Sequence, residues 1–223
     1  MVSSLSSLFL FSLSLHCLAP CFAAANKKNI TIDEAALLTF KSLITSHPSD
    51  VLANNWSTSY SVCNWVGVTC DERHNRVHTL NLTKMGLRGT VSPNLGNISF
   101  LVILDLSFNS FGGQFPKEIG WLRRLKFLRL SHNEFSGEIP GTLGDLSQLQ
   151  SLKLGTNNFS GFIPQSIGNF HLLKILALDF NMLSGPIPQT ISNMYSLETI
   201  SLSKNNLSGT SSLIFEYYYV SYL

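Results

Sequence analysis

Eight aromatic and charged residues occupy matching positions of a 24-residue repeat, and their chemistry suits molecular contact better than catalysis. They are Asp105, Phe108, Phe127, Arg129, His132, Lys153, Asp179 and Phe180. Strands that lie about 4.8 Å apart would align such side chains into columns on one face of a sheet. Aromatic rings beside charged groups are typical of protein and peptide contacts. We predict that these residues form a ligand-binding patch; the alternative is that they are tolerated surface residues.

The sequence shows no arrangement of residues that is typical of an enzyme. It contains no G-x-S-x-G turn, no glycine-rich phosphate loop and no kinase signature. Asp33 and Glu34 suit the positive end of a helix dipole, and His74 and His78 lack a third metal ligand. We therefore expect no catalytic activity, no cofactor and no metal. The net charge of +2 also argues against nucleic acid as a partner.

The patch depends on a repeat whose apolar residues form three columns. The columns begin at Val77, Leu80 and Leu82, and each recurs every 24 residues. A fixed period of about 20–50 residues indicates a solenoid, in which each turn buries its apolar face against its neighbours. We predict an α/β solenoid of six 24-residue repeats over residues 77–210. A short strand should lie around the second and third columns of each repeat.

Asparagine and glycine columns complete the repeat. Where the chain leaves a strand, its backbone groups lose their partners, and an inward-pointing carboxamide can donate and accept in their place. A column of glycines from Gly89 to Gly209 suits positive φ or close backbone approach. The Ile-Pro sequences that follow suit the edge of a short second strand or a turn. We assign this structural role to the asparagine column, Asn109, Asn133, Asn157, Asn181 and Asn205.

The first 25 residues lack Asp, Glu, Lys and Arg, and their apolar run ends in the three alanines at 23–25. This is typical of a cleaved secretory signal peptide; the alternative is a retained membrane anchor. Cleavage would remove Cys17 and Cys21. Cys63 and Cys70 would then remain as an even pair, which predicts a disulfide in an oxidising compartment.

Six N-x-S/T sequons also favour export and predict N-linked glycosylation. They lie at Asn29, Asn55, Asn81, Asn97, Asn158 and Asn206. We expect a secreted or cell-surface protein, with no transmembrane helix in the mature chain.

Residues 26–76 do not follow the repeat and predict an N-terminal cap, which a solenoid needs to cover its first apolar face. Thr31 to Glu34 fits a capping box with Thr31 as the N-cap, and apolar residues at helical spacing follow. Residues 50–56 could form a second short helix. Val66 and Val68 alternate as they would in a short strand.

These residues carry a family resemblance. The unit from Leu125 to Leu146, with the pattern LxxLxxLxLxxNxFSGxIPxxLGxL, resembles the plant-specific class of leucine-rich repeat. Asp33-Glu-Ala-Ala-Leu-Leu through Cys63-Asn-Trp-Val-Gly-Val-Thr-Cys70 resembles the N-terminal cap of the same family. The chain is thus similar to the ectodomains of plant leucine-rich-repeat receptor-like kinases, especially the immune-receptor group. This implies a right-handed superhelix whose concave parallel sheet binds a peptide, a pattern molecule or a partner receptor in defence or developmental signalling.

The resemblance stops after Gly209, where an Ile-Pro should follow. Residues 211–223 instead form an apolar tail outside the repeat, and no membrane span of about 20 apolar residues or kinase segment follows. We interpret the chain as a shortened product of a longer receptor gene, and we expect its last strand edge to be unpaired. The alternatives are a stand-alone inhibitor of a cell-wall hydrolase, similar to polygalacturonase-inhibiting proteins, and a non-functional fragment.

Overall fold

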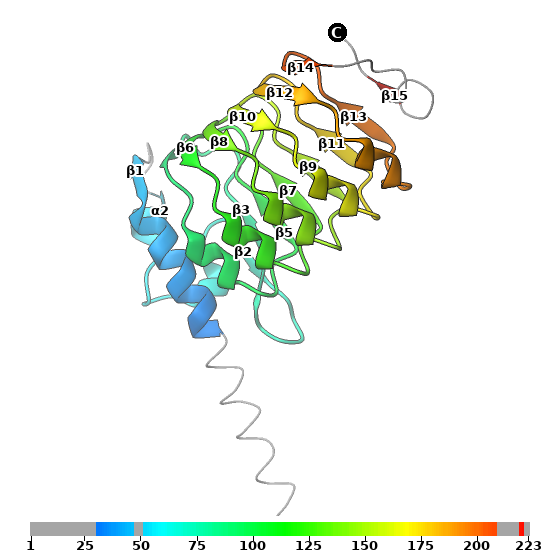
Figure 1. Ribbon diagram of the computed structural model, residues 1–223. Coiled ribbons are helices and arrows are strands. Elements are labelled where there is room, and N and C mark those ends of the chain that lie inside the picture. The colour runs from blue at the N-terminus through cyan, green and yellow to red at the C-terminus, as the bar shows by residue number, and fades with distance from the viewer. Residues whose placement is uncertain (1–29, 47–50, 209–218, 221–223) are drawn as a thin grey trace, which may run out of the picture.

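The computed structural model describes residues 30–46, 51–208 and 219–220. The predicted signal peptide, the sequon at Asn29 and most of the apolar tail lie outside these residues. The described chain forms a row of stacked turns, with the helices of the N-terminal cap at one end (Figure 1). This arrangement confirms the predicted solenoid.

The larger sheet has eight strands in the order β15-β13-β11-β9-β7-β5-β3-β2. All neighbouring strands are parallel except β2 and β3, which are antiparallel. Equivalent residues of successive repeats are paired; Ile103, for example, lies opposite Thr79 on one side and Phe127 on the other. The strands are β2 (Val68–Cys70), β3 (Val77–Asn81), β5 (Ile103–Asp105), β7 (Phe127–Arg129), β9 (Ser151–Lys153), β11 (Ile175–Ala177), β13 (Thr199–Ser201) and β15 (Tyr219–Val220).

The middle residue of each short strand points into the core. Leu104, Leu128, Leu152 and Leu176 are fully buried. Because successive side chains of a strand alternate between its two faces, the residues on either side of each leucine point away from the core. The apolar columns therefore determine which residues the larger sheet presents outward.

A second sheet has seven strands in the order β1-β4-β6-β8-β10-β12-β14. The glycines of the glycine column, from Gly89 to Gly185, lie within its strands. The Ile-Pro sequences lie just beyond the ends of these strands; Ile139 and Pro140, for example, follow a strand that ends at Glu138. The glycines of this column have positive φ, for example 74° at Gly113, a conformation that glycine adopts without steric cost. The strands are β1 (Ile44–Ser46), β4 (Arg88–Gly89), β6 (Ser110–Gln114), β8 (Glu134–Glu138), β10 (Asn158–Phe162), β12 (Met182–Pro186) and β14 (Asn206–Ser208).

Short 3-10 helices return the chain from the second sheet to the first. In four of them a proline is the N-cap, as Pro140 is for η4; its fixed φ and missing N–H suit a helix start. Each helix buries an apolar side chain, such as Leu143. The helices are η1 (Val62–Asn64) in the cap and then η2 (Pro93–Asn97), η3 (Lys117–Trp121), η4 (Gly141–Asp145), η5 (Gln165–Asn169) and η6 (Gln189–Asn193).

The cap contains an α-helix over residues 30–42 and a second one, α2 (Val51–Asn55), as expected. The first helix already includes Ile30, so the prediction of Thr31 as its N-cap is wrong. Val66 also precedes the strand β2 instead of belonging to it. The helix packs on the repeats through Phe40, whose ring centroid is 5.6 Å from that of Phe111. The disulfide between Cys63 and Cys70 is present, with a Cα–Cα distance of 5.3 Å.

Near the C-terminus, β15 pairs with β13 and joins Tyr219 to Thr199 and Val220 to Ile200. The expectation of an unpaired last strand edge is therefore wrong for β13, because a segment of the tail continues the larger sheet. Among the described residues, the second sheet does end at β14. Within the described ranges, no helix combines the length and the apolar character that crossing a bilayer requires.

Candidate ligand-binding face

The outward-facing residues of β3, β5, β7, β9, β11 and β13, together with the loop residues that directly follow these strands, form a surface that we call the strand face. All eight predicted ligand-binding residues lie on β5, β7 and β9 or in the loops that follow β5, β7 and β11. The structure divides them into an aromatic column, a basic group on adjacent strands, and two carboxylates with separate surroundings.

The aromatic column has a backbone conformation that the sequence did not indicate. Its residues have φ between 52° and 59°, although none of them is glycine, asparagine or aspartate. Positive φ is unusual for bulky side chains. Backbone hydrogen bonds between repeats enforce it: the N–H of Asn109, for example, donates to the carbonyl oxygen of His132 at 3.1 Å. The column consists of Lys84, Phe108, His132, Thr156, Phe180 and Lys204.

Two rings of this column stack on each other. The centroids of Phe108 and His132 are 4.2 Å apart, with an angle of 15° between the ring planes. The ammonium of Lys84 lies 5.0 Å from the centroid of the Phe108 ring. Phe180, two repeats beyond His132, is 50% exposed. The left-handed backbone thus presents flat apolar surfaces to solvent.

The basic group lies on adjacent strands. Arg129 on β7 and Lys153 on β9 are register partners, and the Arg129 guanidinium carbon lies 5.2 Å from the centroid of the Phe127 ring. All three side chains are partly exposed. Phe127 and Arg129 therefore lie on the strand face, as the prediction of a contact patch requires.

The two carboxylates differ in their surroundings. Asp105 is only 7% exposed; it accepts a hydrogen bond from the Ser107 N–H at 3.0 Å and lies 3.4 Å from an Arg129 nitrogen. A ligand therefore reaches Asp105 less easily than the other seven residues. Asp179 lies against Gly155, where a Cβ atom would be only 2.8 Å from the carboxylate oxygen. Glycine at 155 leaves space for the Asp179 side chain on this face.

The asparagine column lies between the two sheets and joins successive turns. The amide of Asn157 donates to the carbonyl oxygens of Leu130 and Leu154, both at 3.0 Å. Its Oδ1 accepts from the Phe135 N–H at 3.1 Å. The same pattern recurs at the other four asparagines. These side chains replace the backbone partners that the strands lose where they end.

The sequons in the described residues lie in different places. Asn81 is exposed at the end of β3 on the strand face, and its Oδ1 accepts from the N–H and the hydroxyl of Thr83. Asn97, Asn158 and Asn206 are exposed elsewhere. Asn55 is partly buried, and its Oδ1 accepts from the Val66 N–H. Glycosylation at these positions remains a prediction.

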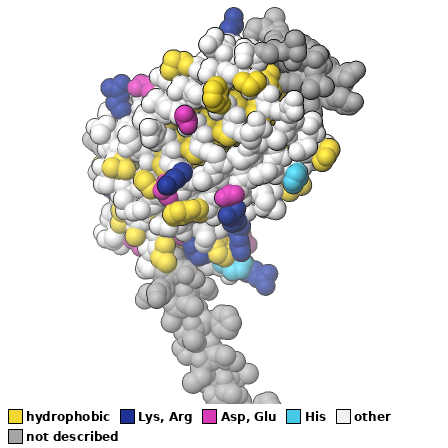
Figure 2. Space-filling view, viewed as in Figure 1, with side chains coloured by type: hydrophobic (Ala, Val, Ile, Leu, Met, Phe, Trp, Pro, Cys, Tyr) yellow, Lys and Arg dark blue, Asp and Glu magenta, His cyan; other side chains and the backbone are white. Residues whose placement is uncertain are grey.

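The side of the molecule in Figure 2 carries charged side chains of both signs close together. Hydrophobic side chains gather over β10 and β12 (Figure 2), where Phe162 and Met182 are 67% and 56% exposed. These residues belong to the second sheet and are separate from the strand face.

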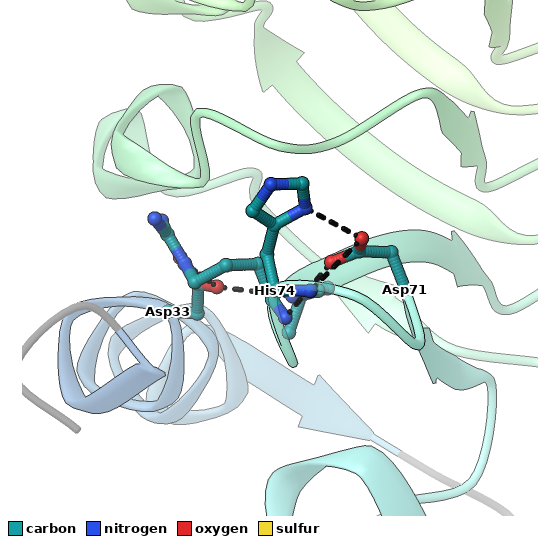
Figure 3. A network of polar contacts seen from close by, with 5 residues as sticks. Asp33, Asp71 and His74 are labelled. Carbon is teal, nitrogen blue, oxygen red and sulfur yellow. Dashed lines mark hydrogen bonds and ion pairs between the residues drawn. The ribbon is translucent and has the colours of Figure 1, made fainter. Parts of the chain in front are cut away.

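A further polar cluster lies in the loop between β2 and β3 (Figure 3). His74 Nδ1 is 2.8 Å from Asp71 Oδ2. Partial burial alone would raise the pKa of Asp71. The hydrogen bond with the His74 side chain and those from the backbone N–H groups of Arg76 and His74 outweigh this effect, and the pKa falls below its ordinary value. In the part of the chain that the structure describes, no three potential metal ligands come together.

Comparison with known proteins agrees with this architecture. The leucine-rich repeat region family matches residues 76–215, and the leucine-rich repeat N-terminal domain family matches residues 32–71. Among curated relatives, the LRR receptor-like serine/threonine-protein kinase EFR of Arabidopsis thaliana is 45% identical over 103 residues, which is 46% of this chain. The matches span only 10%, 8% and 8% of the length of the first three curated relatives.

Solved structures extend the comparison to most of the fold. The LRR ectodomain of the plant membrane receptor kinase GASSHO1/SCHENGEN3 from Arabidopsis thaliana, in complex with CASPARIAN STRIP INTEGRITY FACTOR 2, has a TM-score of 0.72 and 38% identity; the match covers 77% of this chain and 21% of that one. A chain of the BIR3–SERK2 complex from Arabidopsis thaliana has a TM-score of 0.68 and 34% identity, with 79% and 95% coverage. The two family models together match the repeats and the cap. The chain therefore belongs to the leucine-rich repeat family and is similar to the ectodomains of plant LRR receptor kinases.

Proposed function

We propose that this protein is an extracellular recognition module that binds a peptide or a partner receptor on its strand face, without catalysing a reaction. The observation that carries this proposal is the set of partly exposed aromatic and basic side chains on parallel strands. Phe127, Arg129 and Lys153 are adjacent, and Phe108 and Phe180 are 45% and 50% exposed. Aromatic residues and arginine are enriched where proteins bind each other.

The related structures support the recognition of a separate partner molecule. The GASSHO1/SCHENGEN3 ectodomain was solved with CASPARIAN STRIP INTEGRITY FACTOR 2, and the BIR3–SERK2 structure is a complex between two differently named proteins. This similarity supports a location outside the cell, and we propose a role in defence or developmental signalling. No specific observation favours the alternative of a cell-wall hydrolase inhibitor.

The test is a binding screen of the secreted full chain against synthetic peptides and the BIR3 and SERK2 ectodomains. Phe127→Ala and Arg129→Ala should each weaken a complex by more than about 1 kcal/mol. Phe162→Ala, a change on the second sheet where the ring is 67% exposed, is the matched control and should have no effect. The proposal fails if no probe binds, or if the control variant and the two strand-face variants behave alike.

A further inference from the structure

Ser151 is a small, buried residue in a column of larger ones. Its register partners are Phe127 on β7 and Ile175 on β11. Because Leu152 points into the core, Ser151 points toward the strand face. It is nevertheless only 3% exposed. The serine therefore lies low on the face, between an aromatic ring and a branched aliphatic side chain.

Two polar atoms at this place lack partners. Among the described residues, Ser151 Oγ and Arg129 Nε are the two buried side-chain nitrogen or oxygen atoms that make no hydrogen bond. Nearly all buried polar groups in folded proteins are satisfied, so two unsatisfied ones on neighbouring strands need an explanation. Both can donate a hydrogen bond.

The charges around these atoms favour an anion. Lys153 lies two residues after Ser151 on the same strand and is partly exposed. Its side chain makes no hydrogen bond or ion pair with any described residue, whereas the neighbouring Arg129 is paired with Asp105. Asp105 faces one terminal nitrogen of Arg129 at 3.4 Å and leaves Nε free. Around Ser151, the two cationic side chains and the free hydrogen-bond donors therefore outnumber the one carboxylate, that of Asp105, which contacts Arg129. The side chains of Phe127 and Ile175 on either side are apolar and partly exposed.

We propose that Ser151, Arg129 and Lys153 form a subsite for the carboxylate of an Asp or Glu side chain in an extended peptide. The Ser151 hydroxyl and Arg129 Nε donate to the carboxylate, and Lys153 supplies the opposite charge. An apolar residue of the same peptide packs against Phe127 or Ile175. The side chains of Arg129 and Lys153 move apart to admit the ligand. This inference rests on the proposed function and specifies the chemistry of its ligand.

The repeat itself supplies variants that should fold. Isoleucine occupies the Ser151 position in the second and fifth repeats, at Ile103 and Ile175, and threonine occupies it at Thr79 and Thr199. Ser151→Ile therefore removes the hydroxyl and introduces a side chain that this position holds in two other repeats. Ser151→Thr keeps the hydroxyl.

The test uses two immobilised libraries of random nonapeptides whose central residue is fixed as Glu in one and as Gln in the other. The secreted full chain should bind peptides from the Glu library at least tenfold more tightly. Ser151→Ile and Lys153→Met should each weaken that binding at least tenfold. Ser151→Thr should leave it within about threefold. Lys117→Met, which removes an exposed lysine from η3 and not from the strand face, should have no effect. Circular dichroism melting curves confirm that each variant is folded.

The outcomes separate the subsite from the proposed function. Equal binding to both libraries, with Phe180→Ala still weakening it, would overturn the subsite and leave the proposed function standing. Failure to bind either library would overturn the subsite and peptide recognition together. A soluble polyuronate serves as a third probe: if it binds in place of peptides and depends on Lys153, the ligand is an acidic glycan and the peptide assignment is wrong.

Discussion

Asp33 in the cap helix and Arg76, directly before the first repeat, form a buried, two-pronged ion pair across 43 residues of sequence. Arg76 Nε and Nη2 each lie 2.7 Å from a carboxylate oxygen, and the two side chains are 6% and 0% exposed. Asp33 also accepts from the Val77 N–H at 3.0 Å. One carboxylate thus fixes the cap helix to the first strand of the solenoid.

Removal of either partner should destabilise the fold strongly, because the other charge would remain buried without compensation. We expect Arg76→Met to lower the free energy of unfolding by about 3–5 kcal/mol. Arg88→Met breaks an exposed ion pair with Glu134, whose side chains are 62% and 50% exposed. It should cost at most about 1 kcal/mol. Urea denaturation measures both; equal losses would refute the structural role of the buried pair.

The asparagine column should be sensitive to truncation. Asn157→Ala removes a buried side chain that donates to two carbonyl oxygens and accepts one N–H. Each orphaned backbone group costs about 1–3 kcal/mol, so the variant should lose at least about 2 kcal/mol. The adjacent exposed Asn158 provides the control, and Asn158→Ala should be nearly neutral. Thermal melts monitored by circular dichroism compare the two.

A substitution in the aromatic column should stabilise the protein. Thr156 has a β-branched side chain and φ of 56°. The left-handed conformation costs such a residue about 1–2 kcal/mol, and asparagine tolerates it far better. Thr156→Asn should therefore raise the free energy of unfolding by about 1 kcal/mol. An unchanged or lower stability would show that the backbone at 156 is not strained.

Stability should fall in acid partly through Asp71. Its pKa in the folded protein is lower than the ordinary value of 3.8. A group whose pKa is depressed by folding contributes stability that is complete above the ordinary pKa and is lost as the pH falls through the folded-state pKa. Asp71→Asn should therefore lose less stability than the wild type between about pH 5 and pH 2.5. The measurement is urea denaturation at a series of pH values; parallel losses of stability in the wild type and Asp71→Asn would contradict this role of Asp71.

The periodic residues were enough to predict the solenoid, its short strands and the alignment of equivalent residues into columns, because each turn must bury its apolar residues against its neighbours. The parallel sheet was implied by the family resemblance. The positive φ of Phe108 and His132 could not be foreseen, since it comes from hydrogen bonds between repeats and not from local preference. Asp105 also contacts Arg129, which lies 24 residues away in the chain and which only the folded sheet brings close. The Asp33–Arg76 pair joins distant segments that no local pattern relates.

The asparagine column has a mechanical consequence. Each carboxamide holds backbone from two neighbouring turns; Asn133, for example, binds Leu106 and Leu130 through its nitrogen and Phe111 through its oxygen. If one turn is pulled away, the asparagine hydrogen bonds that join it to the neighbouring turn are broken as well. Under tension between its two ends, the molecule should lengthen in discrete steps, with one turn unfolding at a time. Unfolding should start at the turn that is held by the fewest asparagine hydrogen bonds.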